Sequence, residues 1–332
     1  MTQRELFRQN RIGTTGVTVT ELGYGASALG NLYQEMPEGE PRRIIEEAWN
    51  QGVRYFDVAP HYGLGLAETR LGAGLREHDG YTLSTKVGRI LEPNEDQSGD
   101  DLENLFAVPS THRRVWDFSA AGVQRSLADS LDRLGVERID IALVHDPDDH
   151  YEAARDHAFP ELARLREQGR IGAIGAGMNQ WEMLADFVTH CDLDVVVLAG
   201  RYTLLDQSAA ETLLPLCQEK GVSVIAAAVF NSGILATHAA NPDARFNYVP
   251  ASPSIVERVA RLRRLCDEHG ITLPQAALQF PLRHPAVASV LVGASSDAEM
   301  RANCENMRAP VPEEFWDALV SEGLTGPSWV PA

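Results

Sequence analysis

The sequence predicts an α/β fold of the (β/α)8, or TIM, barrel type. Short apolar stretches alternate with amphipathic helical stretches along the whole chain, and this alternation gives eight strand-then-helix units. The apolar stretches are nearly continuous, which is typical of parallel strands that are buried on both faces. Neither a Pro/Ser-rich linker nor a shift in composition divides the 332 residues, so we predict a single barrel domain over residues 1–332.

Each unit combines a short apolar strand with a helix that has one apolar face. The first helix, for example, has Pro41 near its start and Gly52 after its end, which are positions that these residues favour. The expected strands are residues 20–27, 53–59, 81–88, 138–146, 170–179, 193–200, 222–230 and 288–294. The helical stretches that follow them are expected at residues 41–52, 67–80, 119–137, 158–169, 180–191, 208–221, 253–270 with 273–285 in the seventh unit, and 297–309.

Two segments lie outside this repeat. Residues 7–22 contain two short β-prone runs, and we expect an N-terminal β-hairpin that closes the bottom of the barrel. Residues 89–118 form a long polar loop after the third strand, and loops of this length are usually either functional lids or disordered. The loop follows the C-terminal end of a strand, where barrel active sites form, and it contains Phe106, Trp116 and Phe118. We therefore favour a substrate lid over a disordered segment.

Composition narrows the possible partners. The net charge of −18 would repel both nucleic acid and an anionic membrane surface. The longest apolar run, residues 224–230, is too short to cross a bilayer, and no signal peptide is recognisable. We therefore expect a cytoplasmic protein that acts on a small molecule. The four cysteines lack CxxC or metal-ligand spacing, so we expect reduced thiols and no metal at Cys191, Cys217, Cys266 and Cys304.

Polar residues gather at the C-terminal ends of three consecutive expected strands. Asp57 and Tyr62 follow the second strand, Lys86 the third and His145 the fourth. Because these strand ends converge on one mouth of a closed barrel, we expect the four side chains to be neighbours. Any one of them alone would be an ordinary surface or packing residue, but together they indicate catalysis.

The four groups suit the transfer of a proton to or from an oxygen atom. A phenol has an ordinary pKa of about 10, and we expect the ammonium of Lys86 to lower the pKa of Tyr62. Asp57 would hold Lys86 in place, and His145 would orient the substrate oxygen. No metal-ligand cluster accompanies these residues, so a hydride-carrying cofactor is the natural complement.

Longer motifs around these residues resemble a known family. The stretches RYFDVAPHYG, LSTKVG, DIALVHDPDD, IGAIGAGMNQW and SVLVGASSDAEMRANCEN resemble the aldo-keto reductase superfamily, and the resemblance extends over essentially the whole chain. It implies that Asp57, Tyr62, Lys86 and His145 form the catalytic tetrad of that family. The phrases MNQWEM, AGRYTLLDQ, VFNSGILAT and QFPLRHPAV are similar to a subgroup that contains L-fucose or D-threo-aldose 1-dehydrogenases and pyridoxal 4-dehydrogenase. The implied activity is NAD(P)-dependent oxidation of a cyclic hemiacetal, an aldose or pyridoxal, to its lactone.

The resemblance also implies residues for the cofactor and the substrate. Asn179 matches an asparagine that binds the nicotinamide carboxamide, and Ala227 replaces the usual stacking aromatic residue, which leaves Phe230 as a possible substitute. The other implied cofactor residues are Gly25, Asn231, Gly233, Leu235, Gly293, Ser295, Glu299 and Asn303. We predict substrate contacts at His61, Trp116, Phe118 and Met178.

Glu299 favours NAD over NADP as the cofactor. It falls where an arginine of the family often meets the 2′-phosphate of NADP, and a carboxylate there would repel that phosphate. The same carboxylate would suit the ribose hydroxyls of NAD. Arg301 is the nearby cation that would favour NADP if it turned toward this position.

Other interpretations were weighed against this one. GYGASALG at residues 23–30 approximates a dinucleotide-binding motif, but the helix begins only near Pro41 and eight units do not suit a Rossmann fold. An aldolase with Lys86 as Schiff-base nucleophile would leave Tyr62 and the cofactor-like C-terminal stretch unexplained. A general aldehyde or ketone reductase stays open, as does a nicotinamide-binding regulatory subunit without activity, although the intact set of four residues favours turnover.

Overall fold

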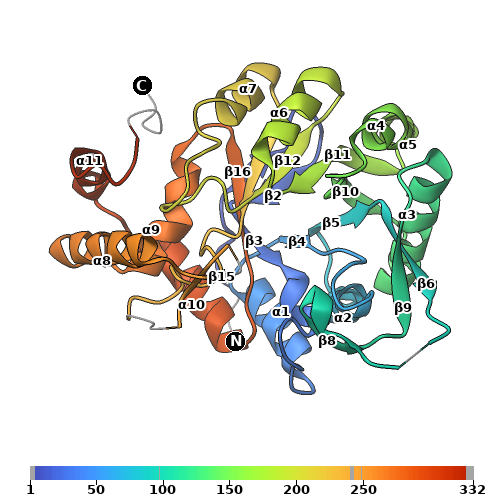
Figure 1. The fold of residues 1–332 in the computed structure, drawn as a ribbon, viewed down its shortest axis with the longest axis horizontal. Coiled ribbons are helices and arrows are strands. Elements are labelled where there is room, and N and C mark those ends of the chain that lie inside the picture. The colour runs from blue at the N-terminus through green and yellow to red at the C-terminus, as the bar shows by residue number, and fades with distance from the viewer. Residues whose placement is uncertain (1–3, 97, 240–242, 248, 327–332) are drawn as a thin grey trace.

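The structure is a computed structural model that describes residues 4–96, 98–239, 243–247 and 249–326. Eight parallel strands form a closed barrel, so the predicted fold class is confirmed (Figure 1). The order around the barrel follows the chain, and the last strand pairs with the first. The strands are β3 (Leu22–Gly25), β4 (Tyr55–Asp57), β5 (Thr82–Val87), β10 (Ile139–His145), β11 (Ile171–Met178), β12 (Val195–Ala199), β13 (Ser223–Ala227) and β16 (Val287–Val292).

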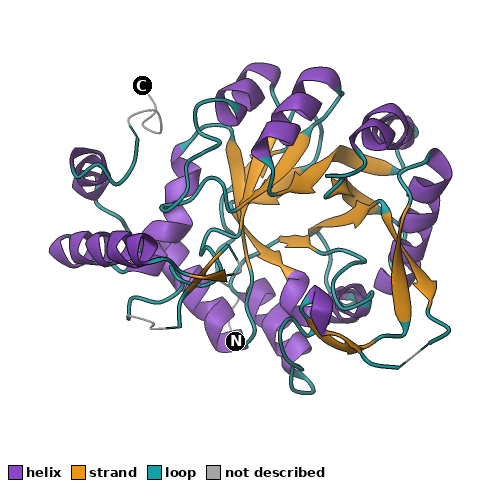
Figure 2. Cartoon of the chain, in the orientation of Figure 1, coloured by secondary structure: helices purple, strands orange, loops and turns teal. Residues whose placement is uncertain are grey.

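Helices surround these strands (Figure 2). The helices that connect successive barrel strands are α1 (Glu40–Asn50), α2 (Leu66–Leu75), α3 (Ala120–Leu134), α5 (Phe159–Glu167), α6 (Trp181–His190), α7 (Leu213–Lys220), α8 (Pro253–Glu268) and α9 (Leu273–Gln279), and α10 (Asp297–Arg308) follows the last strand. A short helix α4 (Tyr151–Ala153) and a π-helical turn at Ala154–Ala158 lead into α5. One more helix, α11 (Glu313–Ser321), packs against α8, and the sequence analysis made no prediction there. No helix in the described ranges has the length and apolar character needed to cross a membrane.

Alternate residues of each strand face opposite layers of the core, as strand geometry requires. Ile141 and Leu143 of β10 belong to the apolar cluster inside the barrel. Their neighbours Ala142 and Val144 belong to the larger cluster between the strands and the helices. Both faces of the sheet are therefore buried, which explains why the strands read as continuous apolar runs.

The N-terminal segment closes the bottom of the barrel, as predicted. Strands β1 (Gln9–Arg11) and β2 (Thr18–Thr20) form an antiparallel hairpin. Ile12 and Val17, at its tip, are buried in the cluster inside the barrel. The Gly13 amide donates a hydrogen bond of 2.8 Å to Ser223 Oγ, at the first residue of β13, so the hairpin lies across the N-terminal strand ends.

The segment after β5 contains regular secondary structure. Strand β6 (Arg89–Pro93) pairs with β9 (His112–Trp116), and β7 (Asp100–Asp101) pairs with β8 (Phe106–Pro109), so the described residues between 89 and 118 include two antiparallel ribbons. Gly88 precedes them with a φ of +102°, and a Cβ there would lie 2.1 Å from the Phe118 ring. Only glycine permits both this backbone turn and the close approach of Phe118.

Candidate active site

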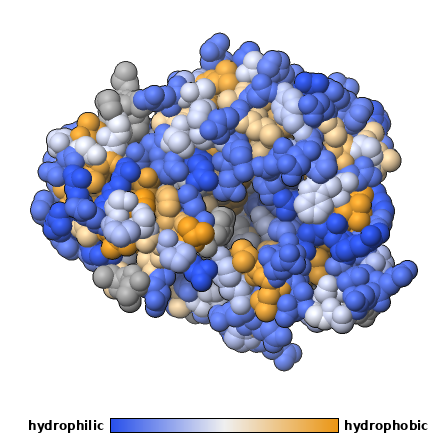
Figure 3. All heavy atoms as spheres, viewed as in Figure 1, coloured by the Kyte–Doolittle hydropathy of each residue, from blue (hydrophilic) through white to orange (hydrophobic). Residues whose placement is uncertain are grey.

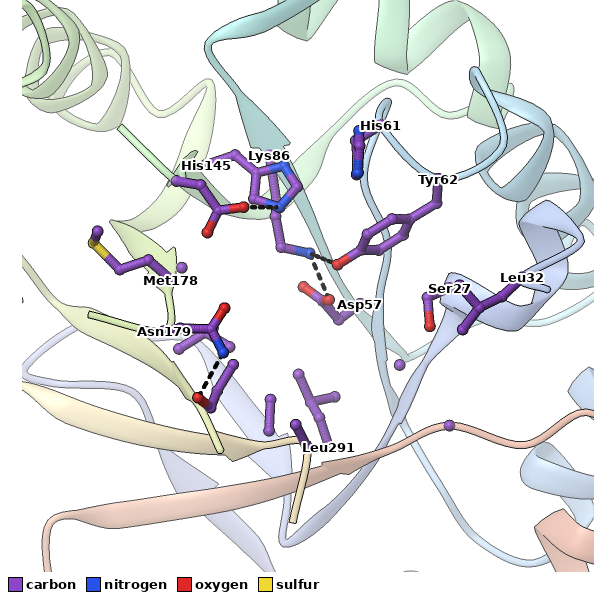
Figure 4. A pocket seen from close by; sticks show the side chains of 18 of the residues that line it. Ser27, Leu32, Asp57, His61, Tyr62, Lys86, His145, Met178, Asn179 and Leu291 are labelled. Carbon is purple, nitrogen blue, oxygen red and sulfur yellow. Dashed lines mark hydrogen bonds and ion pairs between the residues drawn. The ribbon is translucent and has the colours of Figure 1, made fainter. Parts of the chain in front are cut away.

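The C-terminal strand ends surround a cavity of about 410 Å³. Asp57, Tyr62, Lys86 and His145, which the sequence predicted to be neighbours, all line it (Figure 4). Met178 and Asn179 lie across the cavity from Tyr62 in this view. Figure 3 shows that this face of the molecule is hollowed near its centre and that hydrophilic residues form most of the surrounding surface.

Lys86 joins the acid and the phenol of the site. Its Nζ donates to Asp57 Oδ2 at 2.7 Å, to the Val58 carbonyl oxygen at 3.0 Å and to the Tyr62 hydroxyl at 3.2 Å. The Lys86 and Asp57 side chains are only 4% and 6% exposed. Burial by itself lowers the pKa of Lys86, but the charges and hydrogen bonds of Asp57 and Tyr62 raise it above the ordinary lysine value, so Lys86 is a cation.

A second layer of hydroxyl groups holds Asp57. Ser84 Oγ donates to Asp57 Oδ1 at 2.6 Å, and the Tyr55 hydroxyl lies 3.0 Å from the same Oγ. Strand alternation explains this set, because Tyr55 and Asp57 are two residues apart on β4 and Ser84 and Lys86 are two residues apart on β5. The β4–β5 register places Asp57 beside Ser84.

Burial affects the pKa of Tyr62 more than Lys86 does, although Lys86 lowers this pKa as expected from the sequence. Burial raises this pKa above its ordinary value of 10.0 and Asp57 raises it further, whereas the charge and the hydrogen bond of Lys86 lower it. The net shift is upward, so burial outweighs the lysine. Tyr62 is therefore a protonated phenol at neutral pH.

Two histidines above the phenol are uncharged. Burial and the nearby cations Arg89 and Lys86 lower the pKa of His145 well below its ordinary value. Burial, Arg89 and Arg114 lower the pKa of His61 to about 2. The ring centroids of His61 and His145 are 6.0 and 5.9 Å from that of Tyr62, so both imidazoles bound the space in front of the phenol.

Residues 89–118 reach the cavity through a different set of side chains from the one predicted. Asn104, Leu105 and Phe106 line the cavity. Trp116 does not line it but is largely exposed and stacks on Arg89, with the guanidinium carbon 5.2 Å from the ring centroid. Phe118 is buried and lies 5.2 Å from the His150 ring, away from the cavity lining. The insertion thus contributes a wall of the cavity, but not through these two predicted aromatic residues.

Small residues form the opposite wall, and this wall suits a flat aromatic ring of a cofactor. Asn179 donates through Nδ2 to the Ala199 carbonyl oxygen at 2.9 Å and leaves its own amide oxygen beside the cavity. The cavity surface around it consists mainly of residues without long side chains, namely Gly25, Gly177, Ala199, Ala227, Ala228 and Gly293. Phe230, predicted as a substitute stacking ring, packs against the main core and does not line the cavity.

The loop after β13 also fits a bound cofactor. Asn231 is buried, and its Oδ1 has no hydrogen-bond partner among the described residues. Ala228 and Asn231 have φ angles of +53° and +46°, so the loop makes tight left-handed turns near the cavity. Gly233 is open to solvent on its side-chain face, whereas Leu235 is buried in the core. An unsatisfied buried polar atom beside such a loop fits a site for a polar ligand.

The last group of predicted cofactor residues lies in and just before α10. Glu299 Oε2 accepts hydrogen bonds from the Ser295 amide and from Ser295 Oγ, both at 2.8 Å. Asn303 donates to the Gly293 carbonyl oxygen at 3.2 Å. Arg301 does not turn toward Glu299; it makes two hydrogen bonds of 2.9 and 3.0 Å to Glu47 of α1.

Two ion pairs near the cavity, each with a largely buried arginine, were not predicted from the sequence. Arg89 pairs with Asp146, and Arg114 pairs with Asp101. Asp146 follows the predicted His145 directly, so its position at a strand end was the available signal. Arg89, Asp101 and Arg114 lie in the insertion, and no periodic pattern there indicated which charged residues turn inward.

The chain matches a known family over most of its length. The model of the aldo/keto reductase family matches residues 21–322. The chain therefore belongs to the aldo/keto reductase family, and it is an oxidoreductase that acts on CH–OH groups with a nicotinamide cofactor, NAD or NADP. The family and the enzyme class predicted from the sequence are confirmed.

The chain is similar to individual members of this family. The chain is 42% identical over 314 residues to a D-threo-aldose 1-dehydrogenase from a Pseudomonas species. The match covers 93% of this chain and 95% of the relative. It is 40% identical over 333 residues to pyridoxal 4-dehydrogenase from Microbacterium luteolum, covering 94% and 96% of the two chains. Among solved structures, the holo form of an aldo-keto reductase from Bacillus halodurans matches with a TM-score of 0.77 and 26% identity, over 96% of this chain and 97% of that one.

Proposed function

We propose that this enzyme oxidises a cyclic hemiacetal to its lactone, with NAD as the hydride acceptor. The hemiacetal is either pyridoxal or an aldose such as L-fucose. The observation that carries the proposal is the position of Lys86, whose ammonium lies 2.7 Å from Asp57 and 3.2 Å from the Tyr62 hydroxyl beside the cavity. The names of the two relatives support the substrate class. One acts on an aldose and the other on pyridoxal, and both compounds close into hemiacetals.

Each of the four polar residues at the strand ends has a separate role in removing the proton of the hemiacetal hydroxyl. Tyr62 takes the proton of the hemiacetal hydroxyl as the C–O bond becomes a carbonyl. Lys86, held by Asp57, stabilises the negative charge that the phenolate carries before this transfer. Neutral His145 donates a hydrogen bond to the same substrate oxygen and orients it. A nicotinamide cofactor held along the wall of small residues would supply the hydride acceptor, so that loss of one proton to Tyr62 and of one hydride from the anomeric carbon would leave the lactone.

The cofactor is proposed to lie along the wall of small residues. Asn179 would bind the carboxamide, and Gly25 and Gly293 leave room beside it. The loop with Asn231, Gly233 and Leu235 would cross the pyrophosphate, and Ser295, Glu299 and Asn303 would surround the adenosine.

Two contacts support NAD rather than NADP. By the family resemblance, the Glu299 carboxylate would lie near the 2′-phosphate of NADP, and like charges repel. Arg301, the cation that would otherwise favour NADP, is held by Glu47 through two hydrogen bonds. The ribose hydroxyls of NAD can donate to a carboxylate, whereas a phosphate cannot.

The first test is a substrate screen. NAD or NADP reduction is followed at 340 nm with L-fucose, other aldoses and pyridoxal. We expect oxidation of at least one hemiacetal, faster with NAD. Oxidation of NADH or NADPH by open-chain aldehydes, without oxidation of any hemiacetal, would favour a general reductase, and cofactor binding without turnover of any compound would favour a regulatory subunit. A covalent adduct on Lys86 after borohydride treatment with substrate would favour the aldolase instead.

A substitution tests the role of the phenol. Tyr62→Phe removes one oxygen atom and should lower kcat by at least about 10³-fold, because proton transfer in the transition state is lost. Cofactor affinity, measured by the quenching of tryptophan fluorescence, should stay close to that of the wild type. Tyr81→Phe is the matched control, since Tyr81 packs on Phe56 outside the cavity. Activity retained in Tyr62→Phe would refute the proposed role.

A further inference from the structure

Asp146 has an unusual backbone at the edge of the cavity. It directly follows His145, lines the cavity and has a φ of +39°. Its amide donates to the Gly177 carbonyl oxygen of β11 at 3.1 Å, so the turn is anchored to the barrel. A residue other than glycine rarely adopts this region without a local reason, although aspartate tolerates it better than most residues.

Arg89 fixes the orientation of the Asp146 carboxylate. Arg89 Nη2 donates to Asp146 Oδ2 at 2.5 Å, and its side chain is only 10% exposed. Trp116 stacks on the guanidinium from the other side. His145 Nε2 lies 3.5 Å from the same oxygen, Oδ2. Oδ1 has no hydrogen bond from any described residue, and the side chain is 30% exposed beside the cavity.

Stability alone does not account for this arrangement. An ion pair between a buried Arg89 and a partly exposed Asp146 contributes little to stability on balance, because the removal of the guanidinium from water offsets the attraction. The left-handed backbone of Asp146 is a further cost. Both costs fall on one residue, which presents a fixed carboxylate oxygen to the cavity. Such clustering of costly features beside a reaction site indicates a role in the reaction.

The Asp146 carboxylate lies beside the imidazole that would contact the reacting oxygen. His145 Nε2 is 3.5 Å from Asp146 Oδ2, and the His145 ring centroid is 5.9 Å from that of Tyr62. A substrate whose reacting oxygen contacts Tyr62 and His145 therefore has the substituents of its reacting carbon near Asp146, which lines the same cavity. In a cyclic aldose one of these substituents is C2, which carries a hydroxyl group.

We propose that Asp146 is a specificity-determining residue whose Oδ1 accepts a hydrogen bond from the hydroxyl group next to the anomeric carbon, and that Arg89 positions it. This inference rests on the proposed function. It predicts a preference for aldoses with a free C2 hydroxyl, because an unpartnered carboxylate oxygen in a partly buried site disfavours an analogue that lacks the donor.

The test compares one aldose that the wild type oxidises with its 2-deoxy analogue. For each enzyme we measure the discrimination, which is the ratio of kcat/KM for the aldose to kcat/KM for the analogue. The wild type should discriminate by about 10- to 100-fold, as expected for a hydrogen bond to a charged group. Asp146→Asn should reduce this ratio to about threefold or less. Asp149→Asn, an exposed aspartate three residues later, is the matched control and should keep the wild-type ratio.

A second pair of variants tests the positioning role of Arg89. Arg89→Met should lower the discrimination mainly through KM for the aldose, and Arg89→Lys should restore part of it because the charge returns. A structural role alone would lower kcat/KM for both substrates equally and leave the ratio unchanged.

The outcomes separate this inference from the function on which it rests. A wild-type enzyme that oxidises no hemiacetal would overturn the proposed function and this inference with it. A wild-type enzyme that oxidises aldoses, but whose discrimination is the same in Asp146→Asn, would overturn only the role of Asp146.

Discussion

Arg114 is expected to hold the insertion against the loop that carries Tyr62. Its guanidinium makes hydrogen bonds of 2.7 and 2.5 Å to the two carboxylate oxygens of Asp101. Nη2 also donates to the His61 carbonyl oxygen at 2.9 Å. The two charged side chains are 6% and 7% exposed. Removal of one partner leaves the other charge buried and uncompensated, which costs about 3–5 kcal/mol. Arg114→Met should lower the free energy of unfolding by about that amount.

A double-mutant cycle isolates the contribution of the ion pair. Urea unfolding is measured for Arg114→Met, Asp101→Leu and the double variant. Because apolar replacement of both partners removes the uncompensated charge, the double variant should be about 2–3 kcal/mol more stable than the sum of the single effects implies. Arg113→Met is the matched control. Arg113 is exposed and pairs with Glu92 at the surface, so its removal should cost less than about 1 kcal/mol. Additive effects of the two buried substitutions would refute the reasoning.

Two further predictions concern the cofactor and the proton. Glu299→Gln should raise the ratio of kcat/KM for NADP to kcat/KM for NAD by about tenfold, since a charge near a phosphate is worth roughly 1–2 kcal/mol at an effective dielectric of about 20. Glu305→Gln, exposed on the same helix, should leave this ratio unchanged, and an equal ratio in both variants would contradict the role of Glu299. Because burial raises the pKa of Tyr62, its phenolate is scarce at neutral pH. We therefore expect kcat/KM for aldose oxidation to increase with pH by up to about tenfold per unit from pH 7 to 9. A flat profile would contradict proton removal by Tyr62.

Much of the barrel and of the proton-transfer site was predictable from the sequence. Strand periodicity and the number of units determine the fold, and a closed barrel brings strand ends together whatever their separation in the chain. Lys86, for example, contacts Tyr62 from a different strand, 24 residues away in the sequence. The same two-residue periodicity also identifies Tyr55 and Ser84 as residues that face the same side as Asp57 and Lys86, although the sequence analysis did not use it.

Features that depend on burial or on a turn geometry were not predictable in this way. The sequence places a lysine near Tyr62 but does not give the burial that raises the Tyr62 pKa. In the insertion, the side chains that line the cavity are Asn104, Leu105 and Phe106, which lie in the turn before β8 and at its start, and no periodic pattern in the sequence indicates this turn. Trp116 packs on Arg89 and does not line the cavity. Arg89 in turn contacts Asp146, which does line the cavity.

The charges around the cavity also predict how the enzyme treats an anionic substrate. Among the described residues that line the cavity, Lys86 is the only cation, and Asp57 already compensates it at 2.7 Å. His61 and His145 are neutral, and Asp146 is already paired with Arg89. A phosphate group that enters this cavity would meet no free cation, and a charge left without a partner in a buried site costs about 3 kcal/mol or more. We therefore expect kcat/KM for a phosphate ester of the aldose to be at least about 100-fold below that for the aldose itself, measured as NAD reduction at 340 nm. Asp146→Asn should narrow this gap. Equal turnover of the aldose and its phosphate ester would contradict the view that the paired charges select an uncharged substrate.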